Sequence, residues 1–584
     1  MGKATILGFS PNLAAMISSG GRISTMEGTA GQIWQKSLEL GEEKNERLIG
    51  KVVSSGHTSV LEHGYVNLSF ENVSVFAEQF LIEFRLASFT VKSRRYVDFS
   101  NCGWVTPFAD AARAAVYDAE VRRLFGVYDA LCAAGVPKED ARFVLPYGFH
   151  SNFFCSMNAR ELVHVMNELT YGRGSGIPEL RALGESLFAQ CEAQAPYLAL
   201  RKEREYAVQP PAVPAGEALR CDAAVTLLDG TAEPERLICR AWQIGQGRMP
   251  TELDDAQMRD VLAALLRQPR KRELQQASFT LLFGGMSLAA LTHLTRHRMQ
   301  ALVAPELLKN ADYGRYVLPQ SVLECGMEEV YRAAFSGAAA CAERLESMGA
   351  DETQLCYLLL SGQTVPAVAT MNAGELYTFF RLRTCTRAQW EIRAIAVEAL
   401  HVLRKAHPLL FALYGPTCFM TGHCPEGKMC CGRQAEIRLA EGDTPLGVLG
   451  ELHPDTAERF GLDTRVYAAE LRLPPLFASA GDKRVIYRPL PRYPAVERDL
   501  ALVCDEALPV AEIKDTIRRS GGRHLESVEL FDVYQGAQIE QGKKSVAFSL
   551  RFRGTDGTLS DGDIEPALQK IFRNLQEKGC ILRS

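Results

Sequence analysis

The sequence predicts an α+β protein made of two related domains in tandem, followed by a smaller C-terminal βαββαβ domain. Three observations support this prediction. The length of 584 residues exceeds what one hydrophobic core organises. The first three quarters contain an internal repeat, and the hydrophobic period changes from mainly helical to mainly strand-like after Arg433. The composition, 47% hydrophobic and 23% charged, is typical of a folded globular chain.

The internal repeat relates residues 1–208 to residues 221–432. The segments RFVLPYGFHSNFFCSMNAREL and CYLLLSGQTVPAVATMNAGEL each place an apolar pentapeptide at the same distance before Met-Asn-Ala-x-Glu-Leu, which opens an amphipathic helix. We interpret this match as a tandem duplication. Between the repeats, residues 209–220 are rich in Pro, Ala and Gly, which is typical of a semi-rigid linker.

Charge and cysteine content restrict the class of protein. Lys and Arg number 65 against 70 Asp and Glu, for a net charge of -5, so any RNA contact must come from a local patch. The opening residues MGKATILGFSPN lack the features of a signal peptide, and sixteen cysteines at irregular spacings indicate free thiols. No apolar run reaches about 18 residues. We therefore expect a cytoplasmic protein without a membrane span.

In the first repeat, the segment FRLASFTVKSRRY contains a possible phosphate-binding pair. Ser93 and Arg95 would place a hydroxyl and a guanidinium on one side of a short loop or strand. This combination suits a phosphate. The alternative is a solvated Lys/Ser/Arg turn.

The second repeat carries a cationic motif on two helices. Arg296, His297 and Arg298 end an amphipathic helix, where the helix dipole favours positive charge. Asn372 and Arg383 are about three helical turns apart and share a face. Arg387 would join that face one turn later. A ridge of this kind needs an anionic or polar partner if it is buried. Zinc binding by the histidines of THLTRH is not expected, because no third ligand is nearby.

As a set, these motifs resemble flavin-dependent thymidylate synthases. The shared patterns are R-H-R-x7-S, the segment GHTSVLEH, R-x-x-LP, and the helix containing N-A-x-E-L and A-Q-W-E-I-R. The resemblance covers about residues 1–432, one α/β domain per repeat. It implies reductive methylation of dUMP to dTMP with FAD as cofactor and with NADPH and methylenetetrahydrofolate as co-substrates.

The two repeats depart from this family in complementary ways. The first keeps Ser93, Arg95 and Arg142 but has Glu83-Phe84 in place of Arg-His. The second keeps the other set: Arg296, His297, Arg298 and Arg383. It has Glu306, Leu308 and Cys356 where the family has Ser, Arg and Arg. Because the family shares each nucleotide site between protomers, we predict one complete composite site and one incomplete counterpart.

The resemblance also implies roles for individual residues. The substrate-binding residues would be Ser93, Arg95, Arg142, Arg296 and Arg383. Arg383 would also be catalytic, by favouring negative charge on the uracil. The flavin-binding residues would be Ser59, Asn158, Arg160, Arg296, His297, Arg298 and Asn372. Two family residues inside the x7 stretch are Thr90 and Val91 here, and the family's Gln before Arg-His-Arg is His293.

A cysteine-rich tract closes the second repeat. Cys418, Cys424 and Cys430, with His423 nearby, could hold a structural zinc. The usual C-x2-C pairs are absent, so the alternative is a loop of free thiols.

The C-terminal third resembles a different family, the phenylalanyl-tRNA synthetase β subunit. Residues 433–486 are similar to the end of that subunit's catalytic-like core, and residues 487–584 to its ferredoxin-fold anticodon-binding domain. The residues themselves predict the order βαββαβ: strand RDLALV, helix VAEIKDTIRR, strands LESVELFDVY and SVAFSLRFR, helix ALQKIFRNLQEKG, then CILRS.

Alternation in SVAFSLRFR places apolar residues on one face and Arg551 and Arg553 on the other. With Arg498 and Lys544 they form a candidate RNA-binding patch. The alternative is a solvated sheet face. Nothing in the sequence supplies amino-acid activation, so aminoacylation by this chain alone is not expected.

Three functions remain open from the sequence. The first is a thymidylate synthase acting on dUMP, as a homo-oligomer built from two tandem chains. The second is flavin- and folate-dependent methylation of a uridine in tRNA, recruited by the C-terminal domain. The third is a non-catalytic tRNA-binding protein on a decayed enzyme scaffold.

Overall fold

A computed structural model describes most of the chain. The described residues are 2–208, 223–306, 311–421, 434–439, 444–452, 462, 464, 466–480, 491–506, 508–534, 539–540 and 542–583. The predicted linker at 209–220 lies outside them. The chain divides into two compact units, Met1–Gly432 and Arg433–Ser584, and each is described by itself.

Each repeat of the first unit contains one four-stranded antiparallel sheet. The first sheet has the order β1-β2-β4-β3 and the second has the order β5-β6-β8-β7. The strands of the first are β1 (Lys3–Phe9), β2 (Tyr65–Ser74), β3 (Ser88–Val91) and β4 (His150–Asn158). Those of the second are β5 (Val225–Gly230), β6 (Ser278–Ser287), β7 (Ala301–Val303) and β8 (Thr364–Asn372). The sheets therefore correspond strand by strand, as a duplication requires.

Most of the helices correspond as well. In the first repeat they are α1 (Leu13–Arg22), α2 (Ala30–Leu40), α3 (Glu42–Ser54), the 3-10 turn η1 (Thr58–His63), α4 (Val75–Leu81), α5 (Ala111–Ala133), α6 (Lys138–Ala141), η2 (Arg142–Val144), α7 (Ala159–Thr170), α8 (Pro178–Gln194), η3 (Pro196–Leu198) and α9 (Glu203–Tyr206). In the second they are α10 (Pro234–Gly245), α11 (Asp255–Arg267), η4 (Leu274–Gln276), α12 (Leu288–Thr295), α13 (Gln320–Glu324), α14 (Glu328–Ser347), α15 (Glu352–Leu355), η6 (Cys356–Leu358), α16 (Ala373–Arg383), α17 (Trp390–Ala406), α18 (Pro408–Phe411) and α19 (Thr417–Thr421).

A buried carboxylate fixes the start of α4 and, in the same way, the start of α12. Ser74 donates its backbone N–H (2.8 Å) and its hydroxyl (2.6 Å) to Glu179 of α8. Ser287 donates the same two groups to Glu391 of α17, at 2.7 and 2.5 Å. Each serine also caps its helix by accepting a backbone N–H. These bonds hold the two helices that lead into the Glu83-Phe84 and Arg296-His297 segments.

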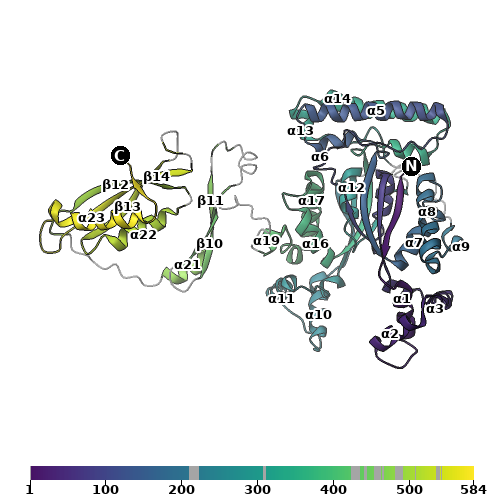
Figure 1. The fold of residues 1–584 in the computed structure, drawn as a ribbon, viewed down its shortest axis with the longest axis horizontal. Coiled ribbons are helices and arrows are strands. Elements are labelled where there is room, and N and C mark those ends of the chain that lie inside the picture. Colours follow the sequence, from purple (N-terminus) through teal and green to yellow (C-terminus); the bar gives the residue numbers. More distant parts are fainter. Residues whose placement is uncertain are drawn as a thin grey trace. The chain divides into compact units, whose positions relative to one another are not determined.

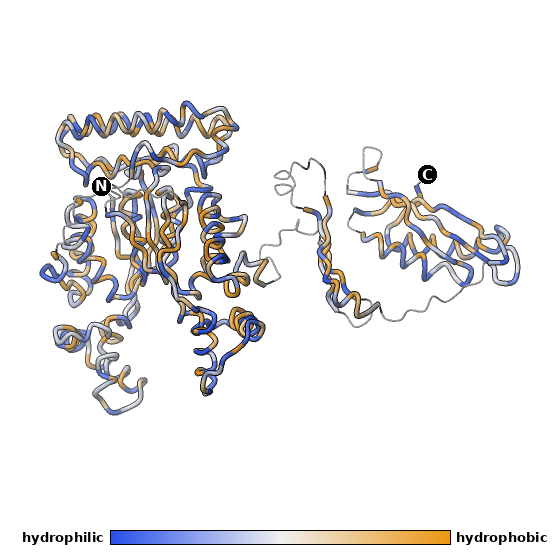
Figure 2. Tube along the Cα trace, turned by 180° about the vertical axis from the view of Figure 1, so that it is seen from behind, coloured by the Kyte–Doolittle hydropathy of each residue, from blue (hydrophilic) through white to orange (hydrophobic). Residues whose placement is uncertain are grey.

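The two repeats form one body with a continuous hydrophobic core. Figure 1 shows the sheets in the middle, with α7 and α8 on one side and α16 and α17 on the other. At one end α5 and α14 lie side by side. The backbone also crosses between the repeats, since Tyr147 N–H donates to Leu359 C=O (2.7 Å) and Gly362 N–H donates to Phe143 C=O (2.8 Å). The apolar colour of the central strands in Figure 2 follows this shared core.

The second unit contains two sheets. Strands β9 (Gln434–Arg438), β10 (Pro445–Glu451) and β11 (Tyr467–Leu471) form a sheet of order β11-β10-β9, followed by α21 (Leu473–Ala480). Strands β12 (Val496–Asp505), β13 (Leu525–Tyr534), β14 (Lys543–Phe552) and β15 (Ile581–Leu582) form the other, of order β13-β14-β12-β15. Helices α22 (Val510–Ser520) and α23 (Asp561–Gln576) cover one of its faces, through a core that includes Phe548 and Ile571. The predicted βαββαβ fold is confirmed.

The structure corrects one prediction about the second repeat. The helix that carries Asn372 and Arg383 ends at Arg383, and Arg387 lies in a turn before α17. The helix stops because Thr384 turns its hydroxyl back onto Phe380 C=O (2.6 Å), and Gln389 caps a new helix. Arg387 therefore does not extend the helical ridge. No helix within the described residues is long and apolar enough to cross a membrane.

Candidate functional site

Five arginines from both repeats gather where the repeats meet. Arg94 and Arg95 follow β3, and Arg142 opens η2 in the first repeat. Arg296 follows α12, and Arg383 ends α16 in the second repeat. Arg95 and Arg142 share Glu139, and Arg95 also reaches Arg387 C=O of the second repeat. Burial, Arg296 and Arg95 lower the pKa of Arg383, which is consistent with this proximity. The group is called the arginine cluster below.

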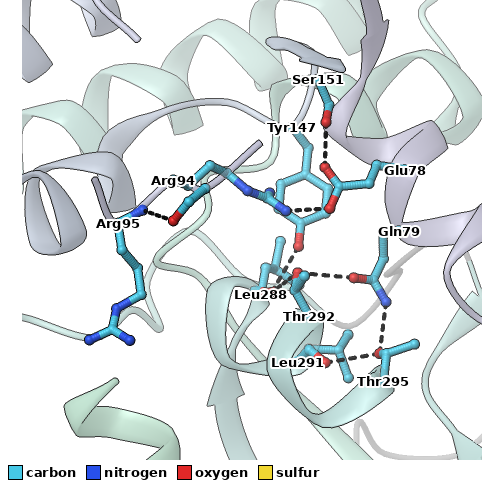
Figure 3. Close-up of polar contacts among 11 residues, drawn as sticks. Glu78, Gln79, Arg94, Arg95, Tyr147, Ser151, Leu288, Leu291, Thr292 and Thr295 are labelled. Atoms are coloured by element: carbon cyan, nitrogen blue, oxygen red, sulfur yellow. Dashed lines mark hydrogen bonds and ion pairs between the residues drawn. The ribbon is translucent and has the colours of Figure 1, made fainter. Parts of the chain in front are cut away.

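Arg94 is anchored in the interior by Glu78 of α4. The guanidinium of Arg94 meets the Glu78 carboxylate at 2.5 Å, and both side chains are buried. The second Glu78 oxygen accepts the Ser151 hydroxyl at 2.6 Å. Figure 3 shows Arg94 directed toward Glu78, whereas Arg95 extends the other way. Arg94 and Arg95 therefore differ in position. Arg94 is buried in the wall of the site, and Arg95 faces the second repeat.

A polar clasp holds α4 of the first repeat against α12 of the second. Gln79 accepts the Thr292 hydroxyl and donates its amide N–H to the Thr295 hydroxyl, both at 3.1 Å. The Tyr147 hydroxyl donates to Leu288 C=O at 2.9 Å. These contacts are visible in Figure 3. They fix the position of Arg296, which follows α12 directly.

Arg95 and Arg142 are both oriented by Glu139. Arg95 Nε lies 2.5 Å from the Glu139 carboxylate, and Arg95 Nη1 donates to Arg387 C=O of the second repeat at 3.1 Å. Arg142 Nε donates to Glu139 C=O at 2.9 Å. Ser93 lies beside them, where its hydroxyl accepts Arg95 N–H at 3.3 Å.

Arg142 is buried with only part of its guanidinium partnered. Its side chain is 4% exposed, and its Nη2 has no hydrogen-bond partner among the described residues. Burial, reinforced by Arg94, lowers the pKa of Arg142 to about 10. A buried guanidinium nitrogen without an acceptor is costly unless a ligand supplies one.

Arg383 is held by His293 and His297 of its own repeat. Its Nε donates to His297 Nε2 at 3.0 Å, and its Nη2 donates to His293 C=O at 3.2 Å. Because His297 Nε2 accepts this bond, the ring proton belongs on Nδ1, which lies 3.2 Å from the Glu375 carboxylate. Burial lowers the pKa of His297, which is consistent with this neutral tautomer. Burial, Arg296 and Arg95 together lower the pKa of Arg383 to about 10.

His293 lies inside the arginine cluster. Burial and the fields of Arg142, Arg383, Arg296 and Arg94 hold its pKa well below the ordinary value. Its Nε2 is buried and, within the described part of the chain, has no hydrogen-bond partner. Four arginines of the cluster thus act on a neutral imidazole, and Glu78, Glu139 and Glu391 offset only part of the cluster's charge. The arrangement favours an anionic ligand with further polar groups.

A second cavity lies at the start of α16, close to His297. It measures about 500 Å³ and is lined by Asn372, Gly374, Lys271 and Arg381, among others. Asn372 caps α16 by accepting Glu375 N–H at 2.9 Å. Arg381 Nε is buried and unpartnered among the residues described. Two cations, a helix N-terminus and an orphaned donor suit the phosphate groups of a ligand.

The first repeat has the equivalent cavity, of about 380 Å³, at the start of α7. Its polar groups already pair with one another. Arg160 meets Glu62 at 2.6 Å, and His164 Nδ1 lies 2.8 Å from the Tyr206 hydroxyl. The two cavities are therefore alike in position and different in charge pairing, because Arg160 meets a carboxylate whereas Lys271 donates to the backbone carbonyls of Leu266 and Gln268.

The structure brings together the residues predicted for substrate binding but divides those predicted for flavin. Ser93, Arg95, Arg142, Arg296 and Arg383 surround one position. Of the flavin set, His297 and Asn372 lie beside the α16 cavity, whereas Ser59, Asn158 and Arg160 belong to the α7 region. Arg298 joins the two regions, because its Nη1 donates to Ala87 C=O (3.0 Å) and the Ser88 hydroxyl (3.2 Å).

Sequence reasoning missed three contributors to the site. Arg94 was hidden between Ser93 and Arg95, and only its pairing with Glu78 reveals its role. Glu139 lies one helical turn before Arg142, a spacing that could have drawn attention to it. His293 was identified as a departure from the family pattern, but its position among the arginines required the fold.

The four residues of the candidate RNA patch lie on two faces of the sheet. Strand register pairs Arg498 with Leu550 and Lys544 with Cys504, on the face that carries the helices. Lys544 is buried and donates to Glu506 C=O at 2.8 Å, and Arg498 pairs with Asp561 of α23. Arg551 lies on the open face, where it pairs with Glu497 at 2.6 Å. Arg553, one pleat further on, pairs with Glu526 at 3.1 Å. The four residues therefore do not form one patch, and only Arg551 and Arg553 share the open side of the sheet.

The predicted zinc ligands are only partly described. Cys418 is exposed on α19. Cys424 and Cys430 lie outside the described residues. Within those residues no group of three His, Cys, Asp or Glu side chains is arranged to hold a metal ion.

Comparison with known proteins gives three family matches. Residues 6–197 and 226–409 match the family described as thymidylate synthase complementing protein, once per repeat. Residues 384–473 match the CLM domain of the phenylalanyl tRNA synthetase beta chain. Residues 491–583 match the ferredoxin-fold anticodon binding domain. The first match contains the whole arginine cluster.

Curated relatives match the C-terminal part. The chain is 46% identical over 153 residues to a phenylalanine–tRNA ligase beta subunit of Symbiobacterium thermophilum, covering 26% of this chain and 17% of the relative. It is 46% identical over 138 residues to that of Clostridium tetani (24% and 17%). For the Synechocystis subunit the identity is 39% over 180 residues (30% and 22%). The chain thus spans less than a quarter of the length of these relatives.

Proposed function

Because the chain belongs to the thymidylate synthase complementing protein family, we propose that it catalyses the reductive methylation of dUMP to dTMP at one composite site. The co-substrates would be methylenetetrahydrofolate and NADPH, with FAD as cofactor. The observation that carries the proposal is the arginine cluster, in which Arg142 Nη2 and His293 Nε2 are buried without partners among the described residues. A nucleotide monophosphate offers the acceptors that such groups need.

The first-repeat and second-repeat residues of the cluster would have different roles in binding dUMP. Ser93, Arg95 and Arg142 would bind the phosphate, with Glu139 holding both arginines in place. Arg383, oriented by His297, would face the uracil and stabilise negative charge that develops on the ring. These arginines are positioned before ligand binding, so little reorganisation is needed when charge develops.

The residues at the start of α16 fit FAD. Asn372, Lys271 and Arg381 would hold its phosphates, and Arg298 would lie at the junction with the first repeat. FAD in its reduced form supplies the hydride for the reaction. The chain's own contribution is binding, orientation and charge: burial favours the neutral form of His297, and Glu375 keeps the ring turned toward Arg383.

The proposal is tested by titrating dUMP into the FAD-reconstituted full chain and following the flavin absorbance bands. We expect a saturable shift. Arg95→Ala and Arg383→Ala should each abolish it, because the cluster needs both repeats. Arg332→Ala is the matched control, since Arg332 pairs with Glu328 on the surface of α14. If either cluster variant binds dUMP normally, the composite site is wrong.

A second candidate function is methylation of a uridine in tRNA. The match of residues 491–583 to an anticodon binding domain favours it, since that domain could recruit tRNA to the same flavin chemistry. A titration in which dUMP leaves the flavin spectrum unchanged and tRNA shifts it would select this candidate. Binding of tRNA without any flavin response to either ligand would instead support a non-catalytic RNA-binding protein.

A further inference from the structure

The symmetry of the repeats gives the arginine cluster a counterpart position, and a cavity lies there. It measures about 270 Å³ and lies between α4 and β7, with Phe76, Phe80, Glu83, Arg173 and Glu306 in its wall. Counting from the capping serines Ser74 and Ser287, Glu83 stands where the cluster has Arg296, and Phe80 where it has His293. The cavity is therefore the counterpart of the proposed nucleotide site.

The charged groups that take the place of cluster residues in this cavity are opposite in sign to those of the arginine cluster. Glu306 replaces Ser93, and Leu169 replaces Arg383 at the end of α7. Cys356, at the start of η6, replaces Arg142. At each of these four compared positions, the arginine or serine of the cluster is therefore replaced by a carboxylate or by an uncharged residue. A nucleotide monophosphate would meet repulsion in place of five arginines.

A guanidinium from the chain itself already occupies part of this cavity. Arg173 Nη1 lies 2.9 Å from the Glu83 carboxylate, and Arg173 Nε lies 3.7 Å from Glu168. The Arg173 guanidinium carbon lies over the Phe80 ring, 4.9 Å from its centroid. An aromatic face and a carboxylate that hold a flat cation in this way form a cation-binding cage.

Carboxylates outnumber cations around the cage. Burial alone would lower the pKa of Arg173, but Glu83, Glu168 and Glu306 together raise it. Burial raises the pKa of Glu83, and Arg173 opposes that rise. One guanidinium therefore faces three acids, and the remaining space is bounded by the apolar side chains of Phe76, Leu302 and Pro305.

We propose that this charge-inverted cavity binds a small organic cation with a flat apolar body, such as an aryl amidine, against Glu83 and Phe80. The two corresponding positions of the repeats would thus bind ligands of opposite charge, an anion at the arginine cluster and a cation beside Glu83. None of the five arginines of the cluster lines this cavity, and neither Glu83 nor Arg173 contacts one of them in a hydrogen bond or ion pair among the described residues.

Benzamidine is a suitable probe, because its amidinium copies the planar head of Arg173 and its ring matches the apolar wall. Binding to the full chain would be measured by ligand-observed NMR and by calorimetry. Benzoate, which has nearly the same shape and the opposite charge, is the control ligand. We expect saturable binding of benzamidine and none of benzoate at the same concentration.

Two variants locate the site. Glu83→Gln keeps the shape and removes the charge, so benzamidine should bind about tenfold more weakly or worse. Arg173→Gln removes the internal competitor and should strengthen binding severalfold, with thermal unfolding checking that both variants fold. Absence of saturable binding, equal binding of benzoate, or unchanged binding in Glu83→Gln would overturn the proposal. The dUMP titration of the same variants should be unaffected, which separates this test from that of the nucleotide site.

Discussion

Replacing Arg142 with methionine should stabilise the unliganded protein while removing dUMP binding. The guanidinium is buried, one of its nitrogens has no partner among the described residues, and burial lowers its pKa to about 10. At neutral pH the chain carries this charge both folded and unfolded. A fall in pKa of that size means that burying the charge costs about 3 kcal/mol of folding free energy.

The substitution also removes a favourable contact. Arg142 Nε donates to Glu139 C=O at 2.9 Å, and losing one such hydrogen bond costs about 1 kcal/mol. Methionine has nearly the same length and fills the space with apolar atoms. The net expectation is a gain of about 2 kcal/mol in the free energy of unfolding.

The assay is urea unfolding of the apo protein, monitored by fluorescence, together with the flavin titration with dUMP. Arg332→Met on the surface of α14 is the matched control and should change neither quantity. The reasoning is refuted if Arg142→Met lowers the free energy of unfolding, or if it leaves the dUMP response intact. The first result would mean that the charge is compensated within the protein, and the second that the ligand lies elsewhere.

The site, the repeat interface and the C-terminal domain each allow one more test. His293 has a pKa far below its unfolded value of about 6.5. Below that pH the unfolded state therefore binds a proton on this ring that the folded state does not bind. Unliganded stability should therefore fall as pH drops below about 6.5, by up to about 1.4 kcal/mol per pH unit from this group, and His293→Gln should flatten the profile in urea denaturation. Gly148→Ala should destabilise by about 1–3 kcal/mol in the same assay, because its Cβ would lie 2.1 Å from Tyr117 Oη at the repeat interface. Arg551→Ala should weaken tRNA binding and reduce its salt dependence by about one charge, whereas Arg498→Ala should not, since Arg498 lies on the helix-covered face.

Each of these predictions has a control. Gly126→Ala lies within α5, where an added Cβ meets nothing within 4 Å, and should not destabilise. A pH profile that stays unchanged in His293→Gln would show that other groups control acid sensitivity. Equal effects of Arg551→Ala and Arg498→Ala on tRNA binding would show that the open face is not the RNA contact.

The local elements of this protein were predictable because they depend on short-range patterns. Alternation in SVAFSLRFR places Val546, Phe548, Leu550 and Phe552 on one face, and the structure buries all four. The Met-Asn-Ala segments open helices in both repeats, and Asn158 and Asn372 cap them by the same hydrogen bond. The length of α16 was overestimated for the opposite reason: the turn at Thr384 depends on one side-chain bond that periodicity does not encode.

Residue types at fixed spacings were enough to predict the tandem repeat, the family, the βαββαβ domain and most members of the arginine cluster. Such patterns are local, so they can be read whatever the chain does elsewhere. Which residues meet one another became known only from the folded chain. The fold buried Arg94 on Glu78, left Arg142 Nη2 and His293 Nε2 without partners among the described residues, and separated Arg498 from Arg551 by strand register. Burial and charge coupling arise between segments far apart in the chain, so a residue's protonation and partners depend on contacts that no local pattern contains.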